Sequence, residues 1–187
     1  MKNMASPAAA IKAEGLTKAF GSRLTLRGID LQINPGESAV IFGPNGAGKT
    51  TLLKVLATIM NPSSGKVFID GLDAKARAEE ARRRIGIVTH HTFLYGNLTA
   101  YENLDFYGRL YDVPARQERI KELVEMVGMT ARLHHRVATF SRGMQQRISI
   151  ARSLLHRPSI MLLDEAETGL DRQATAMLWA AMRMEGG

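Results

Sequence analysis

The stretch ESAVIFGPNGAGKTTLLKVLATIM, residues 37–60, decides the fold class of this 187-residue chain. Its first seven residues form a short and mostly apolar run, which predicts a buried strand. The segment GPNGAGKT, residues 43–50, then fits the pattern G-x-x-x-x-G-K-[ST], and helical periodicity follows it. A glycine-rich loop between a strand and a helix can turn its backbone amides toward a phosphate, while Lys49 reaches the outer phosphates and Thr50 offers a hydroxyl to Mg²⁺. The alternative, a glycine-rich turn without a ligand, would not require this strand–loop–helix context.

A second strand candidate ends in acidic side chains. The stretch PSIMLLDEAETGLD, residues 158–171, is mostly apolar up to Asp164 and Glu165. Carboxylates at the end of a buried strand are costly unless something there needs their charge, although a strand surfacing into an acidic loop would have the same pattern. A phosphate loop requires a negative charge nearby, because it works with an acidic residue that holds Mg²⁺ through its water shell. We therefore predict that Asp164 serves the metal and that Glu165 polarises the attacking water as a general base.

The rest of the chain alternates strand and helix patterns. We expect an antiparallel pair of strands at 11–20 and 24–33, followed by the phosphate loop and its helix. Alternating strands and helices indicate an α/β fold with a central, mostly parallel sheet. We expect one domain spanning 1–187, with an N-terminal antiparallel β subdomain and an inserted α-helical subdomain at about 99–153. The further strands are expected at 65–71, 85–91 and 159–165, and the further helices at 76–84, 99–113, 115–129, 141–157 and 171–184.

Composition narrows the functional classes. The net charge of +7, with arginine clusters such as residues 81–84, favours anionic partners such as nucleotide, nucleic acid or the inner face of a membrane. The chain has no cysteine, which excludes a disulfide framework, a thiolate nucleophile and a cysteine metal site. No stretch approaches 18 consecutive apolar residues, and the first ten residues do not have a secretory pattern. These observations predict a cytoplasmic protein.

Taken together, these motifs resemble the ATP-binding cassette family, the nucleotide-binding subunits of membrane transporters, over essentially the whole chain. The resemblance implies that Phe20 stacks on adenine and that Asp171 lies in a loop that crosses to a partner subunit. It also implies that Thr50 and Asp164 hold Mg²⁺ and that Glu165 is catalytic. The residues of the phosphate loop that it assigns to ATP are Gly43, Pro44, Asn45, Gly46, Ala47, Gly48, Lys49, Thr50 and Thr51.

The segment FSRGMQQR, residues 140–147, occupies the position of the family signature, usually written L-S-G-G-Q. A serine and exposed amides at a helix N-terminus suit the γ-phosphate of ATP bound by a second subunit. The alternative is a plain helix cap with Ser141 as the N-cap residue. The signature residues implied to act on the partner's nucleotide are Ser141, Arg142, Gly143 and Met144, of which Arg142 and Met144 depart from the family pattern.

Three further departures bear on hydrolysis. THHTF stands where the family has a glutamine that touches Mg²⁺ and water, which places His90 there, with His91 as a close competitor. A neutral imidazole can coordinate a metal or bond to water, although either histidine could simply cap the end of a strand. Ala166 replaces the proline that usually follows the catalytic glutamate. The family's later histidine has no counterpart before Gly187, so we expect a cassette cut short that binds ATP and hydrolyses it poorly.

The resemblance therefore implies an ATPase subunit that uses ATP and Mg²⁺, pairs with a second cassette, expected as a homodimer, and binds integral membrane permease subunits at the cytoplasmic face of the cell membrane. Within the family, residues 91–113 and 141–165 are most similar to the subunits of the haem exporter of cytochrome c maturation and related exporters. One alternative is a non-hydrolysing or truncated nucleotide-binding cassette. Another is a soluble ATPase of the same family acting on nucleic acid or the ribosome; we expect no nucleic-acid partner, because no charged linker or long coiled coil is present.

Overall fold

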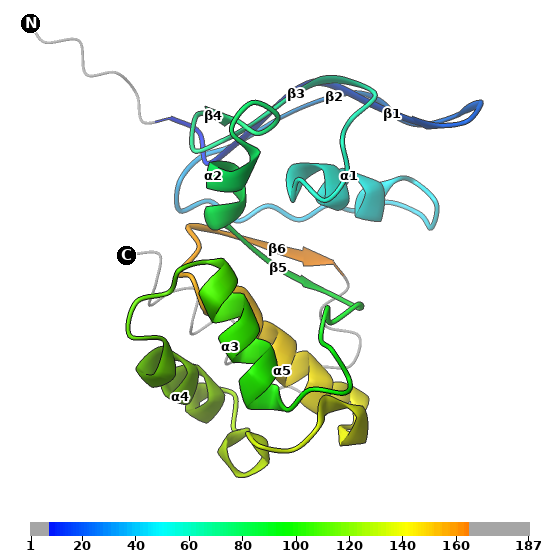
Figure 1. Cartoon of the computed structure of the whole chain (residues 1–187). Helices are drawn as coiled ribbons and strands as arrows, with labels where there is room; N and C mark the ends of the chain where they lie inside the picture. Colours follow the sequence, from blue (N-terminus) through cyan, green and yellow to red (C-terminus); the bar gives the residue numbers. More distant parts are fainter. Residues whose placement is uncertain (1–7, 165–187) are drawn as a thin grey trace, which may run out of the picture. The chain divides into compact units, whose positions relative to one another are not determined.

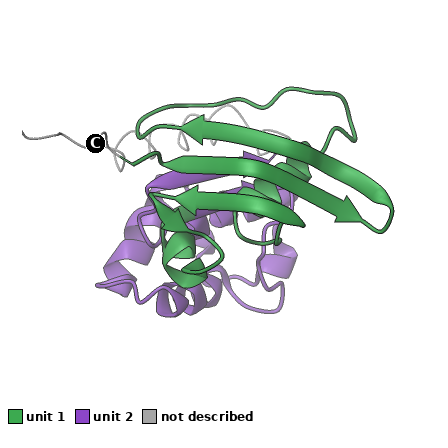
Figure 2. Ribbon diagram, turned by 90° about the horizontal axis from the view of Figure 1, so that it is seen from above, with its two compact units in different colours: residues 1–85 green, residues 86–187 purple. Residues whose placement is uncertain are grey.

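The computed structural model describes residues 8–164 of the chain (Figure 1). The chain divides into two compact units, unit 1 with residues 1–85 and unit 2 with residues 86–187, shown in separate colours in Figure 2. The prediction of one domain over 1–187 with a helical subdomain at about 99–153 stays a prediction.

Unit 1 is built on a four-stranded antiparallel sheet in the order β2-β1-β3-β4. The predicted pair of N-terminal strands is confirmed: the first two strands pair from Ile11 opposite Ile33 to Phe20 opposite Arg23. Gly21 closes this hairpin with a φ of 59°, a left-handed conformation that glycine adopts without steric cost. The strands are β1 (Ile11–Phe20), β2 (Arg23–Ile33), β3 (Ser64–Ile69) and β4 (Leu72–Asp73).

Two helices accompany this sheet, α1 (Lys49–Leu56) and α2 (Ala78–Arg83). Helix α1 lies against β1 and β2 and buries its apolar side chains there, since Leu52, Val55 and Leu56 are 8% exposed or less. It ends earlier than the periodicity predicted, because the amides of residues 59 and 60 both turn back to the carbonyl of Lys54. The predicted helix at 76–84 is confirmed as α2, which lies beside β4.

The strand predicted at 37–43 is wrong for this structure. These residues follow β2 as an extended loop without strand pairing, and Val40 and Phe42 are 72% and 88% exposed. An apolar run becomes a strand only where its N–H and C=O groups pair with a neighbouring strand. Within unit 1 the sheet ends at β2 on one side and at β4 on the other, so its ladders do not include this segment.

Up to residue 164, unit 2 combines a pair of strands with three α-helices and two short 3-10 helices, η1 (Thr130–Arg132) and η2 (Val137–Thr139). Strand β5 (Ile85–Thr89) lies beside β6 (Ile160–Asp164), and both arrows run in the same direction in Figure 1. The helices predicted at 99–113, 115–129 and 141–157 are confirmed as α3 (Ala100–Leu110), α4 (Arg116–Met126) and α5 (Arg142–Leu154), which all pack against one another. The helix predicted at 171–184 lies outside the described residues. Their shared core is apolar and fully enclosed, and its largest members are Leu104, Ile120, Leu123, Ile148, Ile150, Leu154 and Leu155. The mixed fold class, with an antiparallel N-terminal sheet and a parallel pair, agrees with the sequence prediction.

The start of α3 shows how local sequence sets an element's boundary. Thr99 is its N-cap residue, and its hydroxyl accepts a hydrogen bond from the backbone amide of Glu102. The Glu102 carboxylate in turn accepts a hydrogen bond from the amide of Thr99, which completes a capping box. The hydrogen bond from the Thr99 amide, followed by one from the Thr99 hydroxyl to the same carboxylate, lowers the pKa of the Glu102 carboxyl.

Candidate functional site

The predicted phosphate loop lies in unit 1 as an exposed turn that leads into α1. Residues 43–47 are exposed, and the amide of Ala47 donates to the carbonyl of Pro44 at 3.2 Å, which tightens the turn. Gly46 and Gly48 have φ values of 82° and 96°, and Gly48 is the N-cap residue of α1. The helix therefore begins directly behind the loop, with its N-terminal amides and the positive end of its dipole at the loop.

Lys49 folds back over this loop. Its Nζ donates to the carbonyl of Gly43 at 2.7 Å and to that of Pro44 at 3.0 Å, so the first residue of α1 spans the turn. An ammonium group held beside an exposed glycine-rich loop places positive charge where phosphate oxygens could bind. The structure thus brings the loop residues and Lys49 together, while their role toward a nucleotide stays a prediction.

Gly48 leaves little room for a larger residue. A Cβ atom added there would lie 3.2 Å from side-chain atoms of Leu26 and Thr25 and 3.2 Å from the Thr25 carbonyl oxygen. The positive φ of this residue adds a second reason for glycine. The close approach of β2 therefore fixes the last turn of the loop.

Phe20, predicted to stack on adenine, ends β1 and is 48% exposed. The Nζ of Lys18 lies 5.4 Å from the centroid of its ring, a cation–π geometry, and donates to the carbonyl of Asn61 at 2.7 Å. The Phe20 ring is thus exposed to solvent, and the ammonium group of Lys18 lies near it.

Asp164 and the two adjacent histidines belong to unit 2. Asp164 is the last residue of β6 and is only 6% exposed. The neighbouring strand β5 ends at Thr89, directly before His90 and His91, which are exposed with ring centroids 5.3 Å apart. Because neighbouring strands of the same direction end at one edge of a sheet, the carboxylate and the histidine turn share this edge.

The signature segment forms the beginning of α5. Ser141 is the N-cap residue, and its hydroxyl accepts from the amide of Met144 at 3.3 Å, as the plain-cap interpretation requires. Ser141 and Arg142 are exposed, whereas Gly143 and Met144 are partly buried. An exposed serine at a helix N-terminus is also what recognition of a partner's phosphate needs, so both interpretations fit the geometry.

The predicted site residues therefore fall into two groups. Phe20 and residues 43–51 are in unit 1, while His90, Ser141 and Asp164 are in unit 2. The predicted base Glu165, with Ala166 beside it, and Asp171 lie outside the described residues. Among residues 8–164, no cluster of three or more histidine, aspartate or glutamate side chains forms a metal site, and no helix has the length and apolarity needed to cross a membrane.

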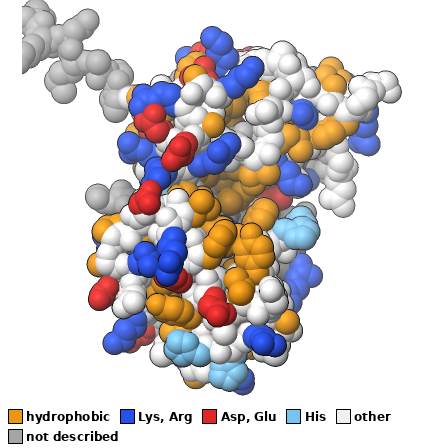
Figure 3. Space-filling view, in the orientation of Figure 1, with side chains coloured by type: hydrophobic (Ala, Val, Ile, Leu, Met, Phe, Trp, Pro, Cys, Tyr) orange, Lys and Arg blue, Asp and Glu red, His pale blue; other side chains and the backbone are white. Residues whose placement is uncertain are grey.

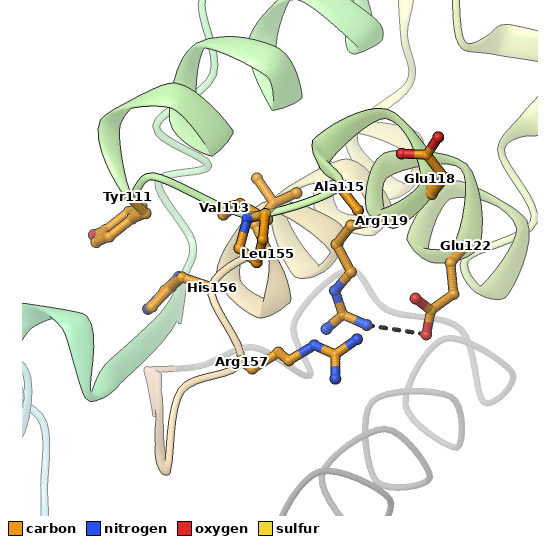
Figure 4. Close-up of a pocket in the computed structure, with 10 residues that line it drawn as sticks. Tyr111, Val113, Ala115, Glu118, Arg119, Glu122, Leu155, His156 and Arg157 are labelled. Carbon is orange, nitrogen blue, oxygen red and sulfur yellow. Dashed lines mark hydrogen bonds and ion pairs between the residues drawn. The ribbon is translucent and has the colours of Figure 1, made fainter.

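A cavity of about 680 Å³ lies in unit 2 between the start of α4 and the end of α5, and none of the predicted site residues lines it (Figure 4). Its charged groups serve the packing of the helices. Arg119 is buried, bonds to Glu122 at 3.0 Å and donates to the carbonyl of Leu154 at 2.7 Å. His156 stacks on Tyr111 with ring centroids 4.0 Å apart.

Two sets of residues in unit 2 were not predicted from the sequence. One is a row of polar side chains on the buried face of α5. The other is a group of exposed large apolar side chains on and beside α3, where hydrophobic side chains gather in Figure 3. Its members are Phe93, Tyr95, Phe106 and Leu110, which are between 42% and 59% exposed. The first set has only a weak signal in the sequence, because its polar residues at three-residue spacing stand among other polar residues of the same helix.

Comparison with known proteins places these features in a family. The sequence model of the ABC transporter family matches residues 26–168. The linearmycin resistance ATP-binding protein LnrL of Bacillus subtilis (strain 168) is 36% identical over 166 residues, covering 88% of this chain and 53% of that protein. A Nod factor export ATP-binding protein I of Cupriavidus metallidurans is 33% identical over 177 residues, covering 94% of this chain and 58% of that protein. The chain thus spans little more than half the length of these curated relatives.

The fold is also that of a solved cassette. The dimeric ATP-binding cassette MJ0796, solved in a post-hydrolysis state with bound ADP and Pi, superposes with a TM-score of 0.83 at 29% identity, covering 94% of this chain and 82% of that chain. This likeness confirms the predicted P-loop NTPase fold.

Proposed function

Because the chain belongs to the ABC transporter family, we propose that it is the ATP-binding and ATP-hydrolysing subunit of an exporter in the cytoplasmic membrane. The observation that carries this proposal is the loop of residues 43–51. Its left-handed glycines lead into the N-terminus of α1, and Lys49 spans the turn 2.7 Å from the carbonyl of Gly43. This arrangement offers backbone amides, a helix dipole and one ammonium group to a chain of phosphates.

We propose the nucleotide and metal roles residue by residue. Thr50 and Asp164 would hold Mg²⁺, which would supply positive charge to neutralise the charge that develops on the phosphates. Glu165 acts as the general base toward water, and His90 takes the place of the usual glutamine beside it, with His91 as the competing candidate. The shared sheet edge of Asp164 and the histidine turn supports this grouping. The residues proposed for ATP are Phe20, Gly43, Pro44, Asn45, Gly46, Ala47, Gly48, Lys49, Thr50 and Thr51, and those for Mg²⁺ are Thr50 and Asp164.

The proposed partners are a second cassette, expected as an identical copy, and integral membrane permease subunits. Residues 141–144 would face the nucleotide of the second cassette, and Asp171 would lie in the loop that crosses to it. The dimeric state of the similar cassette MJ0796 supports pairing. The names of the relatives that confer resistance or export Nod factor support export as the direction of transport. Haem export for cytochrome c maturation remains a hypothesis that rests on the sequence resemblance at 91–113 and 141–165, since these relatives are named for other cargoes.

Equilibrium binding of Mg-ATP tests the proposal, for example by competition with a fluorescent ATP analogue. The matched variants are Lys49→Ala at the start of α1 and Lys54→Ala in its last turn. We expect Lys49→Ala to weaken binding at least about tenfold, because a charge-assisted contact to phosphate is lost, and Lys54→Ala to bind as the parent does. The proposal fails if the parent does not bind Mg-ATP, or if both variants bind equally well.

A further inference from the structure

Helix α5 carries three polar side chains on one buried face. Gln146, Ser149 and Arg152 follow one another at intervals of three residues and are 4%, 0% and 7% exposed. Residues at this spacing lie on the same side of a helix. Buried polar groups are costly unless they are hydrogen-bonded, so their partners indicate what the row is for. We refer to these three residues as the α5 clamp.

All three clamp side chains donate to backbone carbonyls of one short segment, residues 87–92. Gln146 Nε2 donates to the carbonyl of Thr89 at 3.2 Å, and Ser149 Oγ donates to that of Thr92 at 3.2 Å. The guanidinium of Arg152 donates to the carbonyl of Ile87 at 2.8 Å. The clamp therefore holds the end of β5 and the turn after it along the length of α5.

The turn between these contacts is the one that presents the two histidines. The hydroxyl of Thr89 donates to the carbonyl of His91 at 2.6 Å and accepts from the amide of His91 at 3.1 Å. The backbone on either side of His90 is thus fixed, while both imidazole rings stay exposed. Such an arrangement orients side chains for work outside the core.

Arg152 extends the clamp to α3. Its guanidinium lies 5.4 Å from the ring centroid of Phe93 and 5.2 Å from that of Tyr107, and the Tyr107 hydroxyl donates to the carbonyl of Phe93 at 2.6 Å. A cation between two aromatic rings in a desolvated place is a strong contact. Burial lowers the pKa of this guanidinium, whereas its electrostatic interaction with Tyr107 raises it.

We infer that the α5 clamp consists of positioning residues for His90 and His91. It joins the histidine turn to the helix that begins at Ser141, so the turn and the signature end of α5 move as one body. The inference rests on the proposed function, in which a histidine of this turn acts beside the nucleotide. A small displacement of a group that acts in the reaction lowers the reaction rate. This explains why buried hydrogen bonds hold a turn that lies at the surface.

Ser149→Ala tests the inference against a matched control on the same helix, Ser153→Ala. Ser153 is equally buried, but its hydroxyl bonds to the carbonyl of Ile150 within α5 and does not reach the turn. The readouts are hydrogen exchange of the His91 amide and the imidazole proton resonances of His90 and His91 in the full chain. We expect exchange to quicken about fivefold in Ser149→Ala, as the loss of one hydrogen bond allows, with no change in the control.

Gln146→Met provides a second variant that keeps the side-chain volume and removes the donor to Thr89. In Mg-ATP turnover, we expect kcat of either clamp variant to fall about tenfold with KM within about twofold, since the turn is displaced and nucleotide binding is retained. Equal exchange rates and resonances in Ser149→Ala and Ser153→Ala would overturn the inference, as would an unchanged kcat in both clamp variants. If the parent does not turn over ATP, the proposed function fails, while the exchange and resonance data still decide whether the clamp positions the turn.

Discussion

Asn103 offers a sharp test of how the loop before α3 is held. Its side chain is fully buried, and its Oδ1 accepts from the amide of Tyr95 at 2.7 Å. Its Nδ2 donates to the carbonyls of Tyr95 at 3.0 Å and Thr99 at 2.9 Å. One side chain thus supplies three hydrogen bonds to the backbone of residues 95–99, and the substitution Asn103→Ala removes all three.

The expected loss of stability follows from these contacts. Three hydrogen bonds at about 1 kcal/mol net each would cost about 3 kcal/mol. Truncation also leaves a small cavity, while alanine regains roughly 0.5 kcal/mol of helix propensity at this position. We therefore expect Asn103→Ala to lower the free energy of unfolding by about 2–4 kcal/mol.

Urea unfolding followed by circular dichroism measures this difference, with Asn97→Ala as the control, since Asn97 is an exposed residue of the same loop. The control should stay within about 0.5 kcal/mol of the parent. A loss below about 1 kcal/mol in Asn103→Ala, or an equal loss in both variants, would refute the argument that this side chain holds the loop.

Two further predictions concern a carboxylate and a glycine. Burial by itself raises the pKa of Asp105, but hydrogen bonds and positive charge from Arg116 and Arg109 outweigh it and lower the pKa. The carboxylate therefore stabilises the fold above its unfolded pKa of about 4, and this stabilisation is lost as the pH falls through the folded pKa. Asp105→Asn should therefore lower the free energy of unfolding by about 2 kcal/mol at pH 7 and by progressively less below pH ~4. A difference between parent and variant that does not depend on pH in urea titrations would contradict this. Gly48→Ala should cost about 1–3 kcal/mol in the same assay and weaken Mg-ATP binding, because φ is 96° and the new Cβ would lie 3.2 Å from Thr25. Unchanged stability and binding in this variant would show that the loop does not need its left-handed residue.

Local patterns predicted much of this structure. The hairpin of β1 and β2, helices α2 to α5 and strands β3, β5 and β6 follow from alternation, periodicity and turn residues. The glycine loop is also local, since the spacing of its glycines before Lys49 fixes both the turn and the start of α1. Such features depend on residues that are neighbours in the sequence, so one sequence is enough to predict them.

Features that depend on distant partners were predicted poorly. The run at 37–43 has the apolar composition of a strand. It forms a strand only if its backbone pairs with another strand, and its own residues do not specify that partner. The polar residues of α5 would count as exposed by residue type, yet Gln146 reaches a carbonyl 57 residues earlier in the chain. The division into two units at residue 85 likewise reflects the distribution of contacts, which composition does not reveal.

Mg-ATP turnover by the 187-residue chain beside its Glu165→Gln variant, with nucleotide binding checked in both, tests the central claim most directly. We expect that both proteins bind Mg-ATP and that the parent releases phosphate while the variant does not, because the variant lacks the general base. Binding without hydrolysis in both proteins, or equal turnover in both, would contradict the assignment of an ATPase that uses Glu165.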